Sequence, residues 1–185
     1  MMKTIKSTIV LIFALGCMTA SAQRFGATPQ DSMDCIRNLS LYQEFFSQRN
    51  YIDAYEPWLQ VLNVCPANHV NIYIRGVVIM SHKIAQERGD VAKRQEYIDM
   101  ALGLWDLRAK YFGDPGRNLG YKAIDMKRYE PRKVNEVYEM LKKALEMGIG
   151  TGSREVSLAF TFFEVAMENE KAGNISKEDV LEAYD

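Results

Sequence analysis

The chain has few of the side chains that most often carry out chemistry in proteins. Only two histidines occur in its 185 residues, and His69 and His82 have no Cys or acidic partner at metal-binding spacing. The sequence also lacks a Gly-x-Ser-x-Gly motif, a His-Glu-x-x-His motif and a glycine loop that could cradle phosphate. We therefore expect no catalytic residues, no metal ligands and no cofactor, and we interpret the protein as a non-enzyme.

A surplus of positive charge is missing as well. The formal net charge is −1, and removal of residues 1–22, which carry Lys3 and Lys6 but no acid, leaves 21 basic and 24 acidic residues. Nucleic-acid-binding proteins usually concentrate positive charge on one face, so nucleic acid is not an expected partner. The charge is uneven, however: residues 107–133 hold eight basic and three acidic residues, and residues 134–185 hold five basic and eleven acidic. These two segments could attract each other, or the first could present a basic flank to an acidic partner.

The N-terminal segment resembles a targeting sequence rather than part of the fold. A basic start precedes an apolar run over residues 7–16, which is too short to span a bilayer comfortably. The small residues of Ala20-Ser21-Ala22 predict cleavage before Gln23, which makes residues 1–22 a signal peptide. The alternative is acylation at Cys17, which would produce an outer-membrane lipoprotein. In both cases we expect the mature protein outside the cytoplasm, in the periplasm or secreted.

The rest of the chain has the periodicity of helices. After a polar, flexible lead over residues 23–32, apolar residues recur at three- and four-residue spacing, and no stretch alternates with period two. This pattern predicts an all-α domain over residues 33–185. Turn and capping residues divide the domain into about three and a half helix hairpins. The expected hairpins cover residues 33–66, 69–113, 116–148 and 153–185, and the last of them is incomplete.

Large apolar residues surround a small one in the first expected hairpin. If Pro66 ends a repeat, Ala54 takes a position that allows two helices to approach, and large residues fill the space around it: Leu41, Phe45, Trp58 and Val61. In this pattern residues 35–66 resemble a tetratricopeptide repeat (TPR), a helix pair of about 34 residues. Tyr42 and Val61 depart from the family's preference for smaller residues, and Gly76 falls on the small position of the next repeat. The resemblance implies a TPR-like α–α superhelix, and a plain antiparallel bundle is the alternative.

The TPR resemblance also implies a binding surface, because the first helix of each pair in that family lines a concave groove. Carried over by position, the partner-binding groove is lined by Ile36, Leu39, Gln43 and Phe46 from the first hairpin and by Tyr73, Val77 and Met80 from the second. Such a surface suits a helix or extended segment of a partner protein, which implies an adaptor or scaffold of the bacterial cell envelope. Two alternatives remain open. Ile36 and Val77 could instead pack between hairpins, and the protein could carry a small ligand between its helices.

Two cysteines lie near the first and the last residue of the first expected hairpin. Cys35 is close to the start of the first helix, and Cys65 is at the end of the second, so an antiparallel arrangement makes them neighbours. We therefore expect a disulfide, which an exported protein can keep oxidised. The alternative is a pair of buried, unreacted thiols. No Cys-x-x-Cys motif occurs, so we expect no redox function.

Overall fold

The structure is a computed structural model that describes residues 24–149 and 153–183, and these residues form helices and no strands. The expected all-α class is confirmed. The chain divides into two compact units, of which unit 1 ends at Gln86 and unit 2 begins at Glu87. The predicted signal peptide, including Cys17, lies outside the described residues.

Unit 1 contains the helices α2 (Pro29–Ser47), α3 (Tyr55–Val64) and α4 (Asn71–Gln86). Helix α2 begins at Pro29 because Thr28 caps it: the Thr28 hydroxyl accepts from the Asp31 amide, and the Asp31 carboxylate accepts from the Thr28 amide. Helix α2 therefore starts four residues before the expected start at Met33. The expected lead over residues 23–32 is wrong for its last four residues, which are helical.

Helices α2 and α3 form an antiparallel pair, because the start of one is covalently joined to the end of the other. The Cys35–Cys65 disulfide is present, with an S–S distance of 2.09 Å and a Cα–Cα distance of 6.0 Å. Both cysteines are fully buried. The disulfide predicted from the hairpin is thus confirmed, and it fixes the first turns of α2 against the end of α3.

The contact between α3 and α4 depends on a tryptophan on one helix and a glycine on the other. Trp58 on α3 is fully buried, and its indole nitrogen donates a hydrogen bond of 2.7 Å to the Ile72 carbonyl of α4. The indole ring lies against Gly76, where an added Cβ would be 2.5 Å from a ring carbon. Because real Cβ atoms do not approach so closely, α4 can pack on this tryptophan only with glycine at position 76.

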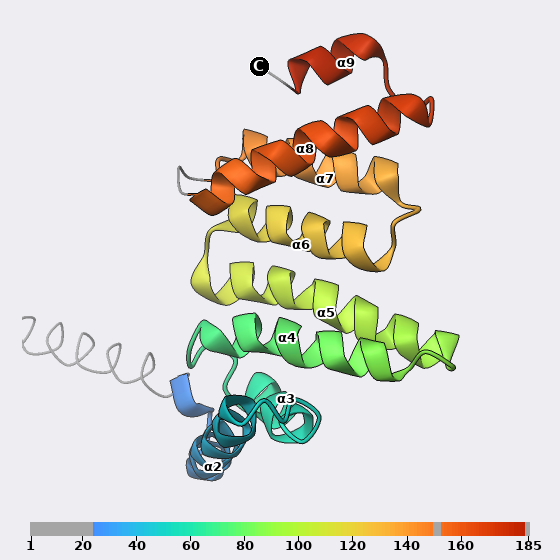
Figure 1. The fold of residues 1–185 in the computed structure, drawn as a ribbon. Helices are drawn as coiled ribbons and strands as arrows, with labels where there is room; N and C mark the ends of the chain where they lie inside the picture. The colour runs from blue at the N-terminus through green and yellow to red at the C-terminus, as the bar shows by residue number, and fades with distance from the viewer. Residues whose placement is uncertain (1–23, 150–152, 184–185) are drawn as a thin grey trace, which may run out of the picture. The chain divides into compact units, whose positions relative to one another are not determined.

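Unit 2 contains five described helices that pack in succession along the chain (Figure 1). They are α5 (Val91–Phe112), α6 (Pro115–Tyr129), α7 (Val134–Glu146), α8 (Ser153–Lys171) and α9 (Lys177–Glu182). A capping box formed by Ser176 and Asp179 begins α9. Gly120 on α6 permits a close approach of α8, because a Cβ there would be 2.9 Å from Leu158.

The helix pairs agree with some of the expected hairpins. The expected hairpin 33–66 corresponds to α2 and α3, the hairpin 116–148 to α6 and α7, and the hairpin 153–185 to α8 and the short α9. The boundary between the units falls inside the expected hairpin 69–113, so α4 and α5 belong to different units. In unit 2 the helix α5 packs on α6 instead.

The core of unit 2 contains a buried carboxyl group. Asp125 on α6 is 5% exposed and accepts a hydrogen bond of 2.8 Å from the indole nitrogen of Trp105 on α5. Burial raises the pKa of Asp125 above its usual value, and the Trp105 hydrogen bond and the positive charge of Arg128 oppose this rise. The indole therefore orients a carboxyl group whose charged form the surroundings disfavour.

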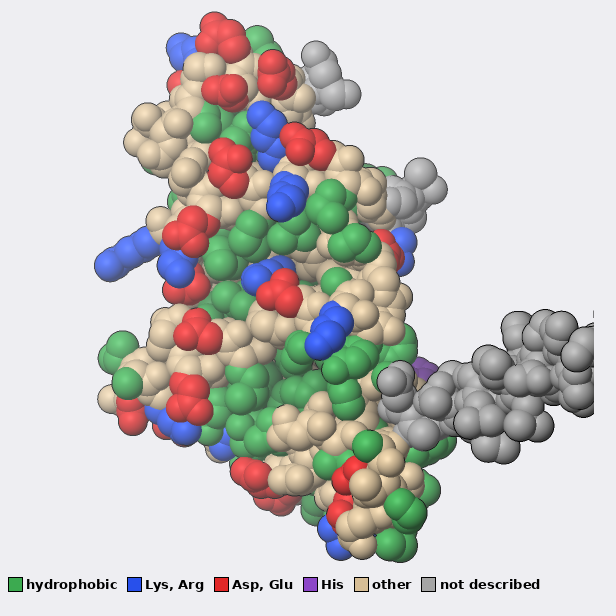
Figure 2. Space-filling model, turned by 180° about the vertical axis from the view of Figure 1, so that it is seen from behind, with side chains coloured by type: hydrophobic (Ala, Val, Ile, Leu, Met, Phe, Trp, Pro, Cys, Tyr) green, Lys and Arg blue, Asp and Glu red, His purple; other side chains and the backbone are tan. Residues whose placement is uncertain are grey.

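On unit 2, lysines form salt bridges with acidic side chains, and other acidic side chains gather at one end. Lys122 contacts Asp106 at 2.6 Å and Lys127 contacts Glu168 at 3.1 Å, so cations of the predicted basic flank are paired within the unit. The Lys127 pair joins α6 to α8, which agrees with the expected attraction between the basic and acidic segments. Acidic side chains gather at the end of unit 2 that contains α9 (Figure 2).

Candidate functional site

The exposed side of α2 in unit 1 carries the first group of predicted groove residues. Ile36 is 54% exposed and Gln43 is exposed, whereas Leu39 and Phe46 are half-buried. Successive members of this group are three or four residues apart, so they lie along one side of the helix. The helix therefore presents a large aliphatic side chain and an amide to solvent on the side that the sequence pointed to.

The second group of predicted groove residues lies elsewhere. Tyr73 and Met80 on α4 are fully buried, and the Tyr73 hydroxyl donates a hydrogen bond of 3.0 Å to the Pro66 carbonyl. These two side chains have no surface to offer a partner, so the prediction is wrong for them. Val77, between them, is half-buried.

Two other residues of α4 face the predicted surface of α2. The guanidinium of Arg75 lies 5.2 Å from the centre of the Phe46 ring. The His82 ring lies 4.3 Å from the ring of Tyr51, which in turn lies 5.1 Å from the ring of Phe46. We call the surface formed by Ile36, Gln43, Phe46, Arg75 and His82 the unit-1 face.

The sequence contained a signal for the missed residues. Arg75 and His82 are seven residues apart, which is about two helical turns, so they share one side of α4. Buried Tyr73 and Met80 have the same spacing and lie roughly 160° around the helix from Arg75 and His82, on the core-facing side. Placement by helical periodicity within α4 would have found the polar side. Placement by family position, carried on from the first hairpin, put the surface residues in the wrong register.

The chemistry of the unit-1 face is that of a recognition surface. It combines an exposed aliphatic side chain, an aromatic ring, a guanidinium and an amide, which together can bury an apolar anchor and donate hydrogen bonds to a carbonyl or carboxylate. The Nδ1 atom of His82 donates to the Val78 carbonyl at 3.0 Å, which fixes the ring against α4. Phe46, Arg75 and His82 are thus each in contact with a neighbouring side chain or carbonyl of unit 1.

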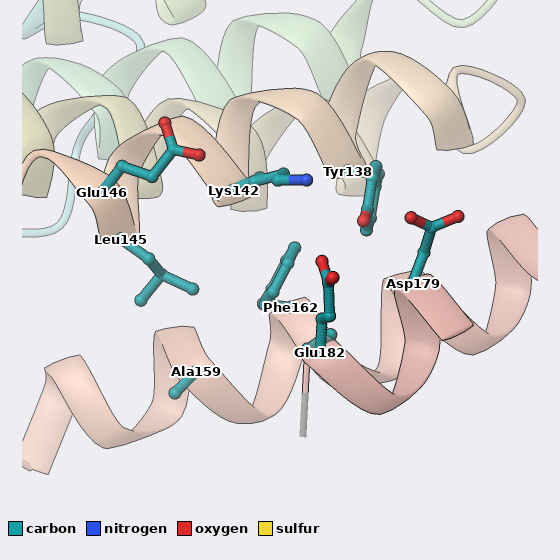
Figure 3. Close-up of a pocket in the computed structure, with 9 residues that line it drawn as sticks. Tyr138, Lys142, Leu145, Glu146, Ala159, Phe162, Asp179 and Glu182 are labelled. Carbon is teal, nitrogen blue, oxygen red and sulfur yellow. The ribbon is translucent and has the colours of Figure 1, made fainter. Parts of the chain in front are cut away.

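A cavity of about 360 Å³ lies between α7, α8 and α9 in unit 2 (Figure 3). Its apolar wall includes the rings of Tyr138 and Phe162, which stack with their centres 5.3 Å apart. Tyr138 is 3% exposed, and burial raises the pKa of its hydroxyl. This volume is within the range of sites for small molecules, which start at about 300 Å³.

The rim of this cavity carries more negative than positive charge. Lys142 comes from α7 with Glu146, and α9 contributes Asp179 and Glu182 (Figure 3). Hydrogen bonds from the Ser176 amide and hydroxyl, both 2.8 Å, lower the pKa of Asp179 and keep this carboxylate ionised. Among the described side chains, neither Glu146 nor Glu182 forms a salt bridge. The cavity therefore suits an apolar group attached to a cation.

Neither surface is accompanied by a recognisable metal site. Within residues 24–149 and 153–183, no three His, Cys, Asp or Glu side chains lie close enough together to hold a metal ion. No helix in these described ranges has the length and apolar composition needed to cross a bilayer.

Comparisons of the chain with models of known protein families, with curated proteins and with solved structures found no match.

Proposed function

We propose that the protein is a non-catalytic adaptor or scaffold of the bacterial cell envelope and that a segment of a partner protein binds along the unit-1 face. The observation that carries this proposal is the position of Ile36. It follows the fully buried Cys35 of the disulfide, yet more than half of its own surface is exposed. A large apolar side chain that a rigid, cross-linked helix holds in water gains free energy when a partner covers it.

The TPR-like architecture and the location are part of the same proposal. Ala54 and Gly76 are small residues at buried helix contacts, as the family pattern requires, and consecutive helices pack on each other within each unit. The disulfide supports an oxidising compartment, because such bonds are rare in the reducing cytoplasm. The basic and apolar start of the sequence supports export by a signal peptide.

A pair of substitutions on α2 tests the adaptor proposal. Ile36→Gln changes the unit-1 face, and Leu41→Gln is the matched control, because Leu41 is 45% exposed and lies roughly 140° around the same helix. We expect cross-linking in intact cells, followed by affinity purification and mass spectrometry, to yield envelope proteins that Ile36→Gln loses and Leu41→Gln keeps. Recovery of the same proteins at the same yield with both variants would contradict the assignment of this face.

A second candidate function is the carriage of a small ligand, and the cavity between α7, α8 and α9 favours it. The ligand would place an apolar group against Phe162 and a cation near Glu146 and Glu182. Ala159→Phe should fill part of this space, because Ala159 is an exposed residue of the cavity wall. Native mass spectrometry should then show a bound small molecule in the parent protein and little in the variant. Equal occupancy in both proteins would refute this alternative.

A further inference from the structure

Helix α8 has two apolar sides, and only one of them is used in the core of unit 2. The core side carries Leu158, Phe162 and Val165, which are between 1% and 7% exposed. On another side, Phe160 is 69% exposed and Val156 is 55% exposed. A helix that needs to bury only one side in its own domain has no structural reason to place a phenylalanine in water.

The apolar residues on this side of α8 follow the spacing of a helix–helix contact. Val156, Phe160, Phe163 and Met167 are separated by four, three and four residues, which is the a/d spacing of a heptad. We call these four residues the α8 seam. Phe163 is half-buried and Met167 is 36% exposed. Val156 and Met167 are eleven residues apart, so the seam is about three helical turns long. This geometry selects a helix, rather than an extended strand, as the complementary shape.

A hollow beside the α8 seam offers a place for an anchoring side chain. Its volume is about 230 Å³, and its wall is formed by Ala159, Phe160, Phe163 and Ala183. All four side chains are apolar or aromatic. A large aliphatic or aromatic side chain of the bound helix can therefore enter between α8 and the end of α9, as anchors do in helix-in-groove recognition.

The charges around the α8 seam are mainly acidic. Glu164 follows Phe160 by four residues and Glu170 follows Phe163 by seven, so helical geometry places them on the two borders of the seam. Lys171 follows Met167 by four residues and lies at the end of the border that carries Glu164. Lys127 contacts Glu164 at 3.9 Å, but the Glu164 side chain remains 62% exposed. Residues 134–185 together hold eleven acidic and five basic residues. Two copies of this surface would repel each other, whereas a basic helix would be attracted.

From this combination we infer that the α8 seam is a docking surface for an amphipathic helix of a partner protein. The bound helix has large apolar side chains at a/d spacing and Lys or Arg residues beside them. Its apolar side covers Val156 and Phe160, one side chain enters the hollow, and its cations lie near Glu164 and Glu170. This surface belongs to unit 2 and is independent of the unit-1 face, so either assignment can fail without the other.

The inference can be tested with designed peptides and the full mature chain. The probe is a peptide of about three heptads with Leu at the a and d positions and Lys beside them. One control peptide has Glu in place of Lys, and a second has the Lys composition in scrambled order. The tested variant is Val156→Gln with Phe160→Gln, and Val91→Gln is the matched control, because Val91 is 80% exposed on α5. Circular dichroism verifies that all variants keep their helical content.

We expect fluorescence anisotropy to show binding of the Lys peptide that is at least about tenfold tighter than binding of either control peptide. The double substitution should weaken it at least about tenfold, since it removes the central apolar contacts, and Val91→Gln should leave it unchanged. The inference is overturned if the Lys peptide does not bind, if the scrambled or Glu peptide binds equally well, or if the double variant binds normally. Dimerisation of the parent protein that the double substitution abolishes would also overturn it, in favour of a second copy on the seam.

Discussion

The disulfide allows a quantitative prediction about unit 1. Cys35 and Cys65 are 30 residues apart, and chain-entropy theory assigns a cross-link of this loop length a stabilisation of about 3–4 kcal/mol at 25 °C. Alanine is the appropriate replacement, because both positions are fully buried and a serine hydroxyl would add a desolvation cost. The double variant Cys35→Ala with Cys65→Ala should therefore lose about 3–4 kcal/mol of unfolding free energy in unit 1. With a denaturant slope of about 1.5 kcal/mol per molar urea, the midpoint should fall by about 2–2.7 M.

The two tryptophans make this loss measurable in one unit at a time. Trp58 belongs to unit 1 and Trp105 to unit 2, and the sequence has no other tryptophan. In a Trp105→Phe background, fluorescence during urea titration reports on Trp58 alone. Reduction of the parent protein should reproduce most of the loss seen in the double variant. If the urea midpoint of the double cysteine variant stays within about 0.3 M of the oxidised parent, the reasoning is refuted, because the disulfide would then contribute little to the stability of unit 1.

Two further substitutions test the packing and the buried carboxyl group. Gly76→Ala should destabilise unit 1 by about 1–3 kcal/mol, because the new methyl group meets Trp58. Gly103→Ala is the control: its methyl group has open space, so it should be neutral or stabilising. Equal urea midpoints for the two variants would contradict this expectation. Burial raises the pKa of Asp125, so the folded state holds its proton more tightly than the unfolded state, whose value is near 3.8. This contribution to stability is present below pH 3.8 and is lost as the pH rises through the folded-state pKa. The unfolding free energy of Asp125→Asn relative to the parent should consequently increase from pH 4 upward, and a constant difference across pH would show that the carboxyl group does not titrate differently on folding.

Local signals in the sequence predicted the helices and the cross-link. Pro66 and the turn at Gly113 mark helix ends that the structure also has. The start of α2 differs from the expected start at Met33 for a specific reason. Asp31 belongs to the residue types that cap helices, but here it is the third helical residue, and its carboxylate accepts a hydrogen bond from the amide of the cap, Thr28. The same residue types favour both positions, so composition alone does not separate them.

The candidate site was less predictable, because it depends on contacts between helices. Ile36 and Gln43 could be placed from the side of α2 on which they lie. Tyr73 and Met80 were misplaced because the register was carried on from the first hairpin instead of being taken from the periodicity of α4 itself. The contact that fixes the rotation of α4, Gly76 against Trp58, joins two helices and has no local signal in either of them. The boundary between the units near Gln86 is likewise a property of packing. The helical periodicity of the sequence continues on both sides of it and therefore does not reveal it.

The position of the cysteines has a consequence for how the chain matures. If the proposed signal peptide, which contains Cys17, is removed, only Cys35 and Cys65 remain, and two cysteines allow a single intramolecular pairing. Oxidation within one chain thus cannot produce a mispaired isomer, and maturation needs an oxidant but no isomerase. Both cysteines also precede unit 2, which contains none. A chain that crosses a membrane N-terminus first could close this bond while its second half is still being synthesised.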